Sequence, residues 1–230
     1  KENRELQNRY ADIDIHVPKT LVITTDAFDE FIQANDLKDL ANSDLTDAQI
    51  SETFLRADFP EWLQEELGRI LVHVAYPIAI RSSSLLEDSP YQPFAGIFET
   101  IMIPNDHPDP AVRVEQLIAA IKSVYASTFS KRAKAYMHAT SYRIEEEKMA
   151  GVVQRLAGVR RGNRYYPDFS GVARSHNFYP TAPQKAEDGI AAVALGLGRA
   201  VVDGTNCVRF SPKYPRHIVA FSSVDDVLEN

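Results

Sequence analysis

The residues best suited to chemistry in this sequence are Arg81 and the three serines that follow it, at the end of an apolar run at 77–80. A strand that ends in a guanidinium and consecutive hydroxyl groups places a fixed cation and several donors at one edge of a sheet, which suits phosphate oxygens. The alternative is an ion pair between Arg81 and Glu87 or Asp88 beside a serine-rich loop. Both interpretations stay open, because the run matches no phosphate motif of defined spacing.

A second candidate is the segment FAGIFET at 94–100, whose aromatic and β-branched residues are typical of a strand. Gly96 would let the backbone approach a ligand closely, but it is equally consistent with a turn into the strand. Strand alternation predicts Phe98 and Thr100 on one side and Glu99 on the other. Taken alone, this segment indicates little about chemistry.

A third candidate is Gln154, a lone amide in the apolar run MAGVVQRLA at 149–157. Such a side chain either completes hydrogen bonds of the neighbouring backbone or faces a ligand. Spacing alone favours the backbone, because most buried side-chain amides act in this way.

Several catalytic patterns are missing from the sequence. Gly196 and Gly198 form a lone GxG that lacks the third glycine of a dinucleotide fingerprint and the lysine of a P-loop. The 6 histidines do not have the spacing of a zinc site, and Cys207 lies in no signature of a thiol nucleophile. The sequence therefore predicts no dedicated metal site and supports neither Rossmann nor Walker chemistry.

The pattern of apolar residues predicts the elements that would position these candidates. Helices are expected at 24–36, 46–56, 60–74, 109–129 and 130–138, and strands at 17–24, 77–84, 94–104, 149–157, 169–177, 206–212 and 216–222, with a hairpin or inserted loop at 159–167 and an apolar, glycine-terminated run at 190–198. Helices dominate the first half and strands the second, without strict alternation. This order predicts an α+β fold with mixed or antiparallel sheets and flanking helices.

Composition limits the function further. The 230 residues are 44% hydrophobic and 25% charged, with a net charge of −7 and 1 cysteine. These values exclude a disordered chain or a disulfide scaffold, and without a long basic run they argue against nucleic-acid or anionic-membrane partners. No stretch approaches the roughly 20 apolar residues of a membrane span, so a soluble, cytoplasmic protein is expected. The start at Lys1 and the helical character of the last segment indicate a piece of a longer chain.

Taken together, the segments resemble the N-terminal ATP-binding domain of the pyruvate phosphate dikinase and phosphoenolpyruvate synthase family, which is ATP-grasp-like. The similar segments occur in the family's order, at 17–32, 79–100, 124–136, 149–175 and 196–204. The resemblance implies one ATP-binding domain over 1–230, truncated at both ends. Its first part, about 17–148, would be helix-rich with strands near 77–104, and its second, about 149–221, strand-rich.

The resemblance also implies roles for individual residues. Arg81 matches the family arginine that contacts the ATP phosphates, and Gly96 and Thr100 match positions that cover these phosphates. Gln154 matches the glutamine lining the nucleotide pocket, which reverses the preference from spacing. Arg132 matches an arginine of the family's Arg-Ala segment, where a structural ion pair is favoured over a ligand contact.

The sequence departs from the family pattern in four places. The Gly-Gly-Lys-Gly loop expected before residue 17 is missing, and the segments that supply Mg²⁺ ligands and further ATP contacts would lie beyond residue 230. Arg199 stands where the family has glutamate, and the connection at 159–169 is longer than usual.

As a function, the resemblance implies transfer of phosphate from ATP through a phosphohistidine in a missing domain to pyruvate. Phosphoryl transfer needs cations that neutralise phosphate charge, so we expect the fragment alone to be inactive. The alternatives are a related dikinase with a glucan or antibiotic acceptor and a non-catalytic nucleotide-binding module.

Overall fold

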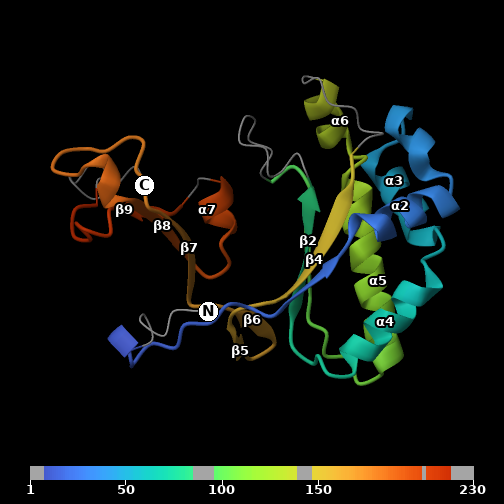
Figure 1. Cartoon of the computed structure of the whole chain (residues 1–230), viewed down its shortest axis with the longest axis horizontal. Coiled ribbons are helices and arrows are strands. Elements are labelled where there is room, and N and C mark those ends of the chain that lie inside the picture. The colour runs from blue at the N-terminus through green and yellow to red at the C-terminus, as the bar shows by residue number, and fades with distance from the viewer. Residues whose placement is uncertain (1–7, 85–95, 139–146, 204–205, 219–230) are drawn as a thin grey trace. The chain divides into compact units, whose positions relative to one another are not determined.

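The computed structural model describes residues 8–84, 96–138, 147–203 and 206–218. The chain divides into two compact units, Lys1–Leu156 (unit 1) and Ala157–Asn230 (unit 2), which are described here one at a time. Unit 1 combines a sheet with helices, and unit 2 consists mainly of short strands (Figure 1). All strand pairs in the described residues are antiparallel, which confirms the α+β prediction.

The sheet of unit 1 has the strand order β1-β4-β2-β3. Its strands are β1 (Thr20–Ile23), β2 (Ile78–Ser84), β3 (Thr100–Ile103) and β4 (Met149–Arg155). The helices of this unit are α2 (Thr25–Ala34), η1 (Leu37–Asn42), α3 (Asp47–Arg56), α4 (Glu61–Leu71), α5 (Pro110–Ser127) and α6 (Lys131–His138). The inner strand β4, which comes last in the sequence of this sheet, thus pairs with both β1 and β2.

Side-chain caps begin two of these helices where the sequence predicts them. The Thr46 hydroxyl accepts from the backbone N–H of Gln49 at 3.3 Å, and the Gln49 side chain accepts from the N–H of Thr46 at 3.0 Å. At the start of α5, Asp109 accepts from the N–H of Ala111 at 2.9 Å, and Pro110 occupies the first turn. These side chains satisfy N–H groups that a helix leaves without backbone partners.

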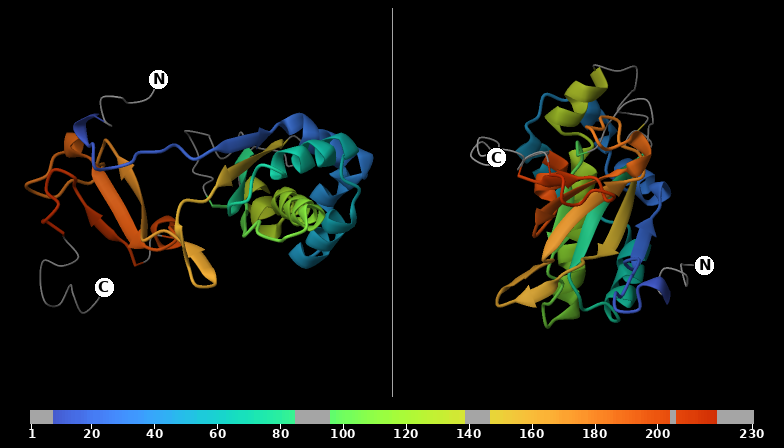
Figure 2. Two further views of the ribbon diagram at one scale, coloured as in Figure 1. Left: turned by 90° about the horizontal axis from the view of Figure 1, so that it is seen from below. Right: turned by 90° about the vertical axis from the view of Figure 1, so that its left-hand side faces the viewer.

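The helices α2, α3, α4 and α5 lie on one side of the sheet (Figure 2). Residues paired across antiparallel strands share a face, so the register assigns each side chain to a side. Ile78, Ile80 and Val153 face the helices and are buried. The opposite side of the sheet, which we call the open face, carries Thr20, Val22, Ala79, Arg81, Ser83, Thr100, Met102, Ala150, Val152 and Gln154.

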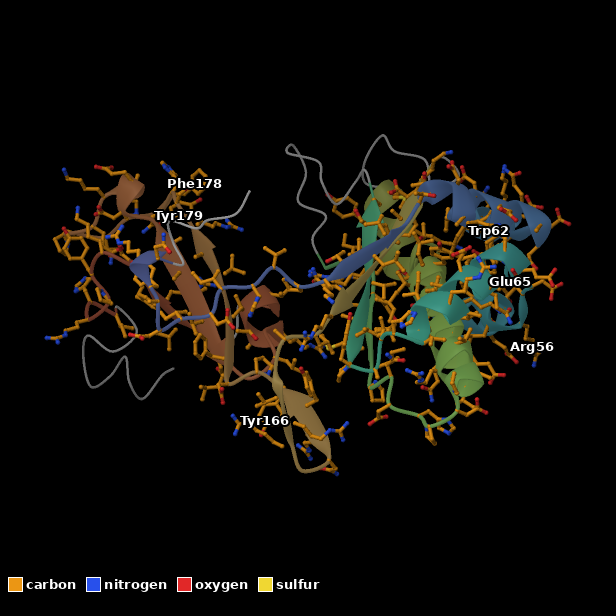
Figure 3. All side chains as sticks on the ribbon, turned by 60° about the horizontal axis from the view of Figure 1, so that its bottom comes forward. Arg56, Trp62, Glu65, Tyr166, Phe178 and Tyr179 are labelled. Carbon is orange, nitrogen blue, oxygen red and sulfur yellow. The ribbon has the colours of Figure 1, made fainter. Side chains whose placement is uncertain are left out.

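The helices of unit 1 present their polar sides outward (Figure 3). Arg56 forms an ion pair with Glu52 at 2.5 Å across one turn of α3. Trp62 is half exposed, and its indole N–H donates to a carboxylate oxygen of Glu30 at 3.0 Å. No helix within the described ranges is long and apolar enough to cross a membrane.

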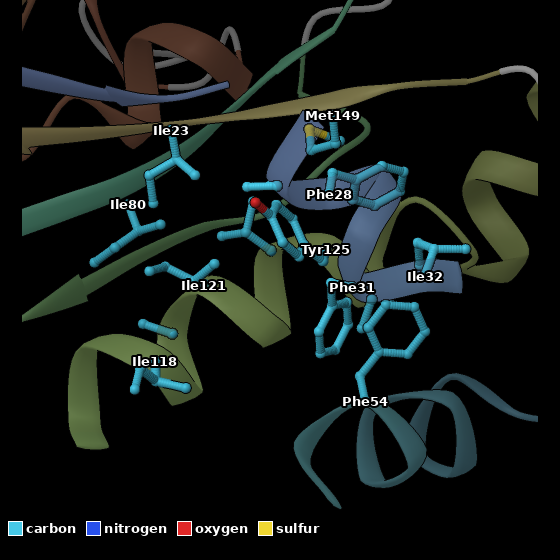
Figure 4. Packing of buried hydrophobic residues seen from close by; sticks show 14 of the residues in the cluster. Ile23, Phe28, Phe31, Ile32, Phe54, Ile80, Ile118, Ile121, Tyr125 and Met149 are labelled. Atoms are coloured by element: carbon cyan, nitrogen blue, oxygen red, sulfur yellow. The ribbon is translucent and has the colours of Figure 1, made fainter. Parts of the chain in front are cut away.

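The core between helices and sheet contains a cluster of aromatic rings around the fully buried Tyr125 (Figure 4). Phe28 packs edge-on against Tyr125 with ring centroids 4.9 Å apart, and Phe31 lies 5.8 Å from the same ring. Phe54 of α3 lies 5.7 Å from Phe31 and completes the cluster on the helical side. Burial without a charged partner raises the pKa of the Tyr125 phenol, so this ring stays neutral. The cluster holds the helices to one side of the sheet.

The alternation predicted for residues 98–100 is wrong. Phe98 is only 6% exposed and belongs to the core, whereas Thr100 is exposed on the open face. The reason is that β3 begins at Thr100, and the chain bends just before it. The Glu99 N–H donates to the Ser127 hydroxyl at 3.1 Å rather than to a strand.

Unit 2 contains a hairpin and a small sheet. The hairpin joins β5 (Val159–Arg161) and β6 (Arg164–Tyr166), and the sheet has the order β7 (Phe169–Arg174), β8 (Ile190–Leu195), β9 (Val208–Phe210). Its short helices are η3 (Ala186–Asp188) and α7 (Arg199–Asp203). Gly162 opens the two-residue turn of the hairpin with φ +63°, a conformation that favours glycine.

The strand predicted at 216–222 does not begin where expected. Arg216 and His217 belong to a turn, in which the His217 N–H donates to the Tyr214 carbonyl at 2.9 Å. The rest of the predicted strand, from residue 219, lies outside the described residues.

Candidate functional site

Arg81 and Thr100 lie side by side on the open face. They are directly paired across the antiparallel strands β2 and β3, and both side chains are exposed. Directly opposed residues have Cβ atoms about 5 Å apart, so a guanidinium and a hydroxyl can reach the same ligand group. The structure thus brings together two residues that are 19 positions apart in the sequence.

The Arg81 guanidinium has no hydrogen-bond or ion-pair partner among the described residues. Glu87 and Asp88, its alternative partners in the sequence, lie outside the described residues. An exposed guanidinium offers five N–H donors in a planar fork, which matches the geometry of phosphate and carboxylate groups. Arg81 is therefore free, within the described structure, to bind an anion.

Gln154 lies on the same face, one strand away from Arg81. It pairs with Ala79 of β2, and Arg81 stands two residues further along that strand. The Gln154 side-chain N–H donates to the Thr20 hydroxyl at 3.1 Å, and that hydroxyl donates to the Pro18 carbonyl at 3.1 Å. The spacing of the sequence alone favoured a hydrogen bond from Gln154 to neighbouring backbone. In the structure, this bond goes to a side chain instead. Thr20 was not identified from the sequence, since its contact joins residues 134 positions apart.

Gly96 and Arg132 lie outside the sheet. Gly96 is exposed in the approach to β3 and has φ +78°, a left-handed conformation that favours glycine. Arg132 is exposed on α6 and has no ion-pair partner among the described residues. The structure therefore gathers Arg81, Thr100 and Gln154 on one face, and it places Arg132 on a separate helix.

Comparison of the sequence with known families gives a match to the family described as pyruvate phosphate dikinase, AMP/ATP-binding domain, over residues 3–219. The chain belongs to this family. Its match covers both units, so the open face is part of a dikinase-family ATP-binding domain.

The chain is similar to several individual proteins, whose names differ. Phosphoenolpyruvate synthase of Pseudomonas aeruginosa is 28% identical over 223 residues, covering 87% of this chain and 26% of that protein. The uncharacterized phosphotransferase YvkC of Bacillus subtilis is 30% identical over 191 residues, covering 82% of this chain and 20% of the relative. Rifampicin phosphotransferase of Bacillus cereus is 25% identical over 205 residues, covering 83% and 22%. The chain thus spans about a quarter or less of the length of these relatives.

The open face of this ATP-binding domain carries a positive charge and no acidic side chain on its strands. Among the residues the structure describes, no group of three or more His, Cys, Asp or Glu side chains could hold a metal ion. The Mg²⁺ ion that the family resemblance implies therefore does not fit the strand residues of this face, because Mg²⁺ prefers oxygen ligands that include carboxylates.

The glycines at 196–198 have a structural explanation within unit 2. Gly196 has φ +71°, and its carbonyl accepts from the Ser170 hydroxyl at 2.7 Å. A Cβ atom on Gly198 would lie 3.1 Å from the Ser170 Cβ, which is a tight contact. The helix α7 then begins at Arg199.

Proposed function

We propose that this chain is the ATP-binding portion of a multidomain phosphotransferase, which passes phosphate from ATP through a phosphohistidine in another domain to pyruvate. The observation that carries the proposal is the placement of Arg81, Thr100 and Gln154 on one exposed face of a sheet. The family to which the chain belongs supports ATP as the ligand. Both units would belong to one domain over 1–230, with parts at about 17–148 and 149–221.

The open face combines apolar side chains with a few polar side chains, as nucleotide binding requires. Val22, Val152 and Met102 give it an apolar surface, and polar groups stand at a few positions around them. Ligand sites are commonly apolar with a few well-placed polar groups that fix orientation. The apolar side chains would contact the nucleoside, and the polar ones would orient it.

Each site residue has a proposed role. Arg81 would hold phosphate oxygens, with the Thr100 hydroxyl as a neighbouring donor. Gly96 would let its own backbone approach the phosphates closely, and Gln154 would line the nucleoside pocket. For Arg132 we favour an ion pair with a structural role over a contact with ATP.

The chain alone is expected to bind ATP without transferring phosphate. Phosphoryl transfer depends on cations that neutralise charge on the transferred group, and Arg81 supplies only part of that charge. The Mg²⁺ ligands and the acceptor histidine would come from regions beyond this chain.

A second acceptor deserves a test because of one relative. Rifampicin phosphotransferase matches 83% of this chain at 25% identity, a level similar to that of the phosphoenolpyruvate synthases. The nucleotide-binding half of the reaction would then be the same, with an antibiotic or other hydroxyl compound in place of pyruvate. Assays of the full-length protein with pyruvate and with rifampicin would separate these acceptors.

The role of Arg81 is tested by calorimetric titration with ATP and Mg²⁺. Arg81→Ala should weaken ATP binding tenfold or more, a loss of about 1.4 kcal/mol. The matched control is Arg56→Ala, which removes the same charge from α3, on the helical side of the sheet. Equal affinity of Arg81→Ala and the unchanged chain would contradict the proposed phosphate site.

A further inference from the structure

The contact between Thr20 and Gln154 determines which end of the Gln154 amide faces outward. The Pro18 carbonyl can only accept, so the Thr20 hydroxyl 3.1 Å away must donate its single proton to it. The same hydroxyl can then only accept from Gln154, which requires the amide nitrogen to lie on the side of Thr20. The carbonyl oxygen Oε1 is left pointing away from Thr20.

This arrangement has consequences for ligand recognition on the open face. Gln154 Oε1 has no partner among the described residues and is a hydrogen-bond acceptor. The amide nitrogen donates one proton to Thr20 and retains a second. Gln154 therefore presents one acceptor and one donor side by side, in an order that Thr20 fixes.

We propose that Thr20 is a positioning residue that makes the site select adenine over guanine nucleotides. This inference rests on the proposed function, because it assumes that a nucleotide binds the open face with its base at Gln154. On its Watson–Crick edge adenine presents an amino donor at N6 beside the acceptor N1, and a glutamine amide matches this pair with two hydrogen bonds. Guanine presents the acceptor O6 beside the donor N1–H on the same edge, which is the reverse order, so its O6 would meet the Oε1 oxygen and its N1–H would meet the amide N–H.

The positions of the other site residues are compatible with this pose. Gln154 is one strand away from Arg81 and two strands away from Thr100. Neighbouring strands lie about 4.8 Å apart, so Gln154 and Thr100 are separated by roughly 10 Å across the sheet. A base at Gln154 thus leaves the phosphates to extend diagonally toward Arg81.

Without Thr20, the preference would be lost. An amide with no partner can rotate by half a turn about its last bond, which exchanges Oε1 and Nε2. The rotated amide would offer a donor to guanine O6 and an acceptor to guanine N1–H. Thr20 thus acts through Gln154 and need not touch the ligand.

The test compares the Kd values for ATP and GTP in three forms of the chain. Thr20→Val removes the hydroxyl with little change of shape, and Thr20→Ser keeps the hydroxyl. We expect the unchanged chain and Thr20→Ser to favour ATP over GTP by about tenfold or more, and Thr20→Val to lose most of this ratio. Because Thr20 is exposed, Thr20→Val should keep the circular dichroism spectrum of the unchanged chain.

A double-mutant cycle with Gln154→Leu separates positioning from a general effect. In the Gln154→Leu background, Thr20→Val should have no further effect on the ratio, since the group that it positions is gone. An unchanged ATP to GTP ratio in Thr20→Val, or an equal loss in Thr20→Ser, would overturn the inference. Absence of binding of either nucleotide by the unchanged chain would instead overturn the proposed function, and the inference with it.

Discussion

At the scale of single residues, long basic side chains stabilise unit 1 by reaching backbone carbonyls. Lys122 of α5 is only 9% exposed and donates to the carbonyls of Leu55 and Ala57 at 3.1 and 2.6 Å. These carbonyls lie at the end of α3, where a positive charge also interacts favourably with the helix dipole. Burial lowers the pKa of Lys122, and the nearby Asp58 carboxylate opposes that change. The ammonium group of Lys122 thus exchanges hydrogen bonds to water for hydrogen bonds to two backbone carbonyls.

Replacing Lys122 by methionine should destabilise the fold. Lys122→Met keeps the length and apolar stem of the side chain but leaves two carbonyls without a donor. We expect a loss of about 1–3 kcal/mol, measured as a lower urea midpoint with an unchanged slope. Lys38→Met is the control, because Lys38 is exposed on η1. An equal effect of the two substitutions would contradict this role of Lys122.

The candidate site could be predicted from the sequence only in part, for a reason that is visible residue by residue. Arg81 and Thr100 can be recognised in the sequence because each is a polar residue next to an apolar run that is typical of a strand. Thr20 and Lys122 do not, because their partners lie 134 and at least 65 positions away, and no local pattern reports such contacts. Side-chain contacts between distant strands and helices require the tertiary structure.

At the scale of elements, periodicity and capping residues located most of the helices and strands. The helix predicted at 46–56 is α3 with Thr46 as its cap, and the strand predicted at 149–157 is β4. The prediction failed at 96–99, because a bend before β3 interrupts a run of residues with strand-like composition, and residues 94 and 95 lie outside the described part of the chain. Composition reports which residues suit a strand, but hydrogen bonds to neighbouring strands decide where it starts.

The capping box of α3 provides a test at this scale. Thr46→Ala removes the hydroxyl that accepts from the Gln49 N–H and should cost about 1 kcal/mol of stability. Thermal unfolding followed by circular dichroism would show the lower midpoint. Ser51→Ala, within the same helix, should have little effect or raise the midpoint, because alanine favours helix interiors. Equal unfolding midpoints of Thr46→Ala and Ser51→Ala would contradict the stabilising role of the Thr46 cap.

At the scale of the whole molecule, the two units differ in how much apolar surface they bury. The main core cluster belongs to unit 1, whereas the buried apolar side chains of unit 2, within its described residues, are Ala191 and Ala194. Burial of apolar surface is the dominant favourable term in folding. Unit 2 must therefore depend more strongly on its polar contacts.

Asp188 is the centre of such a contact set in unit 2. Its carboxylate accepts from the Lys213 ammonium at 2.7 Å and from the Lys185 N–H at 2.8 Å, and its side chain is 3% exposed. Its backbone carbonyl accepts from the Ser211 hydroxyl at 3.3 Å. The hydrogen bond from Lys213, followed by that from the Lys185 backbone, holds the pKa of Asp188 below its ordinary value.

The lowered pKa predicts how the stability of unit 2 depends on pH. The unfolded state takes up the proton more readily, near the ordinary aspartate pKa of about 3.9. The stabilisation by Asp188 is therefore complete well above that pH and is lost as the pH falls through the lower folded pKa. Asp188→Asn should destabilise unit 2 near neutral pH and have a progressively smaller effect under acidic conditions.

Two signals allow this prediction to be assigned to one unit. Trp62 is the single tryptophan of the chain and lies in unit 1, so its fluorescence reports that unit. Asp188→Asn should shift the unfolding transition seen by circular dichroism to lower denaturant while leaving the main fluorescence change in place. Asp168→Asn is the control, since Asp168 pairs with Arg161 at an exposed position. A pH-independent effect of Asp188→Asn would contradict the predicted linkage.

The hairpin of unit 2 has a consequence for how this chain could change over evolutionary time. Its first and last residues, Val159 and Tyr166, are paired, so the chain leaves and returns at nearly the same point. Gly158 closes the base tightly, because a Cβ atom there would lie 2.7 Å from the Tyr166 backbone. A segment that begins and ends at one place can be gained, lengthened or deleted with little change in the path of the flanking strands. A hairpin of this kind is thus a variation that a lineage can acquire without redesigning the strands that precede and follow it.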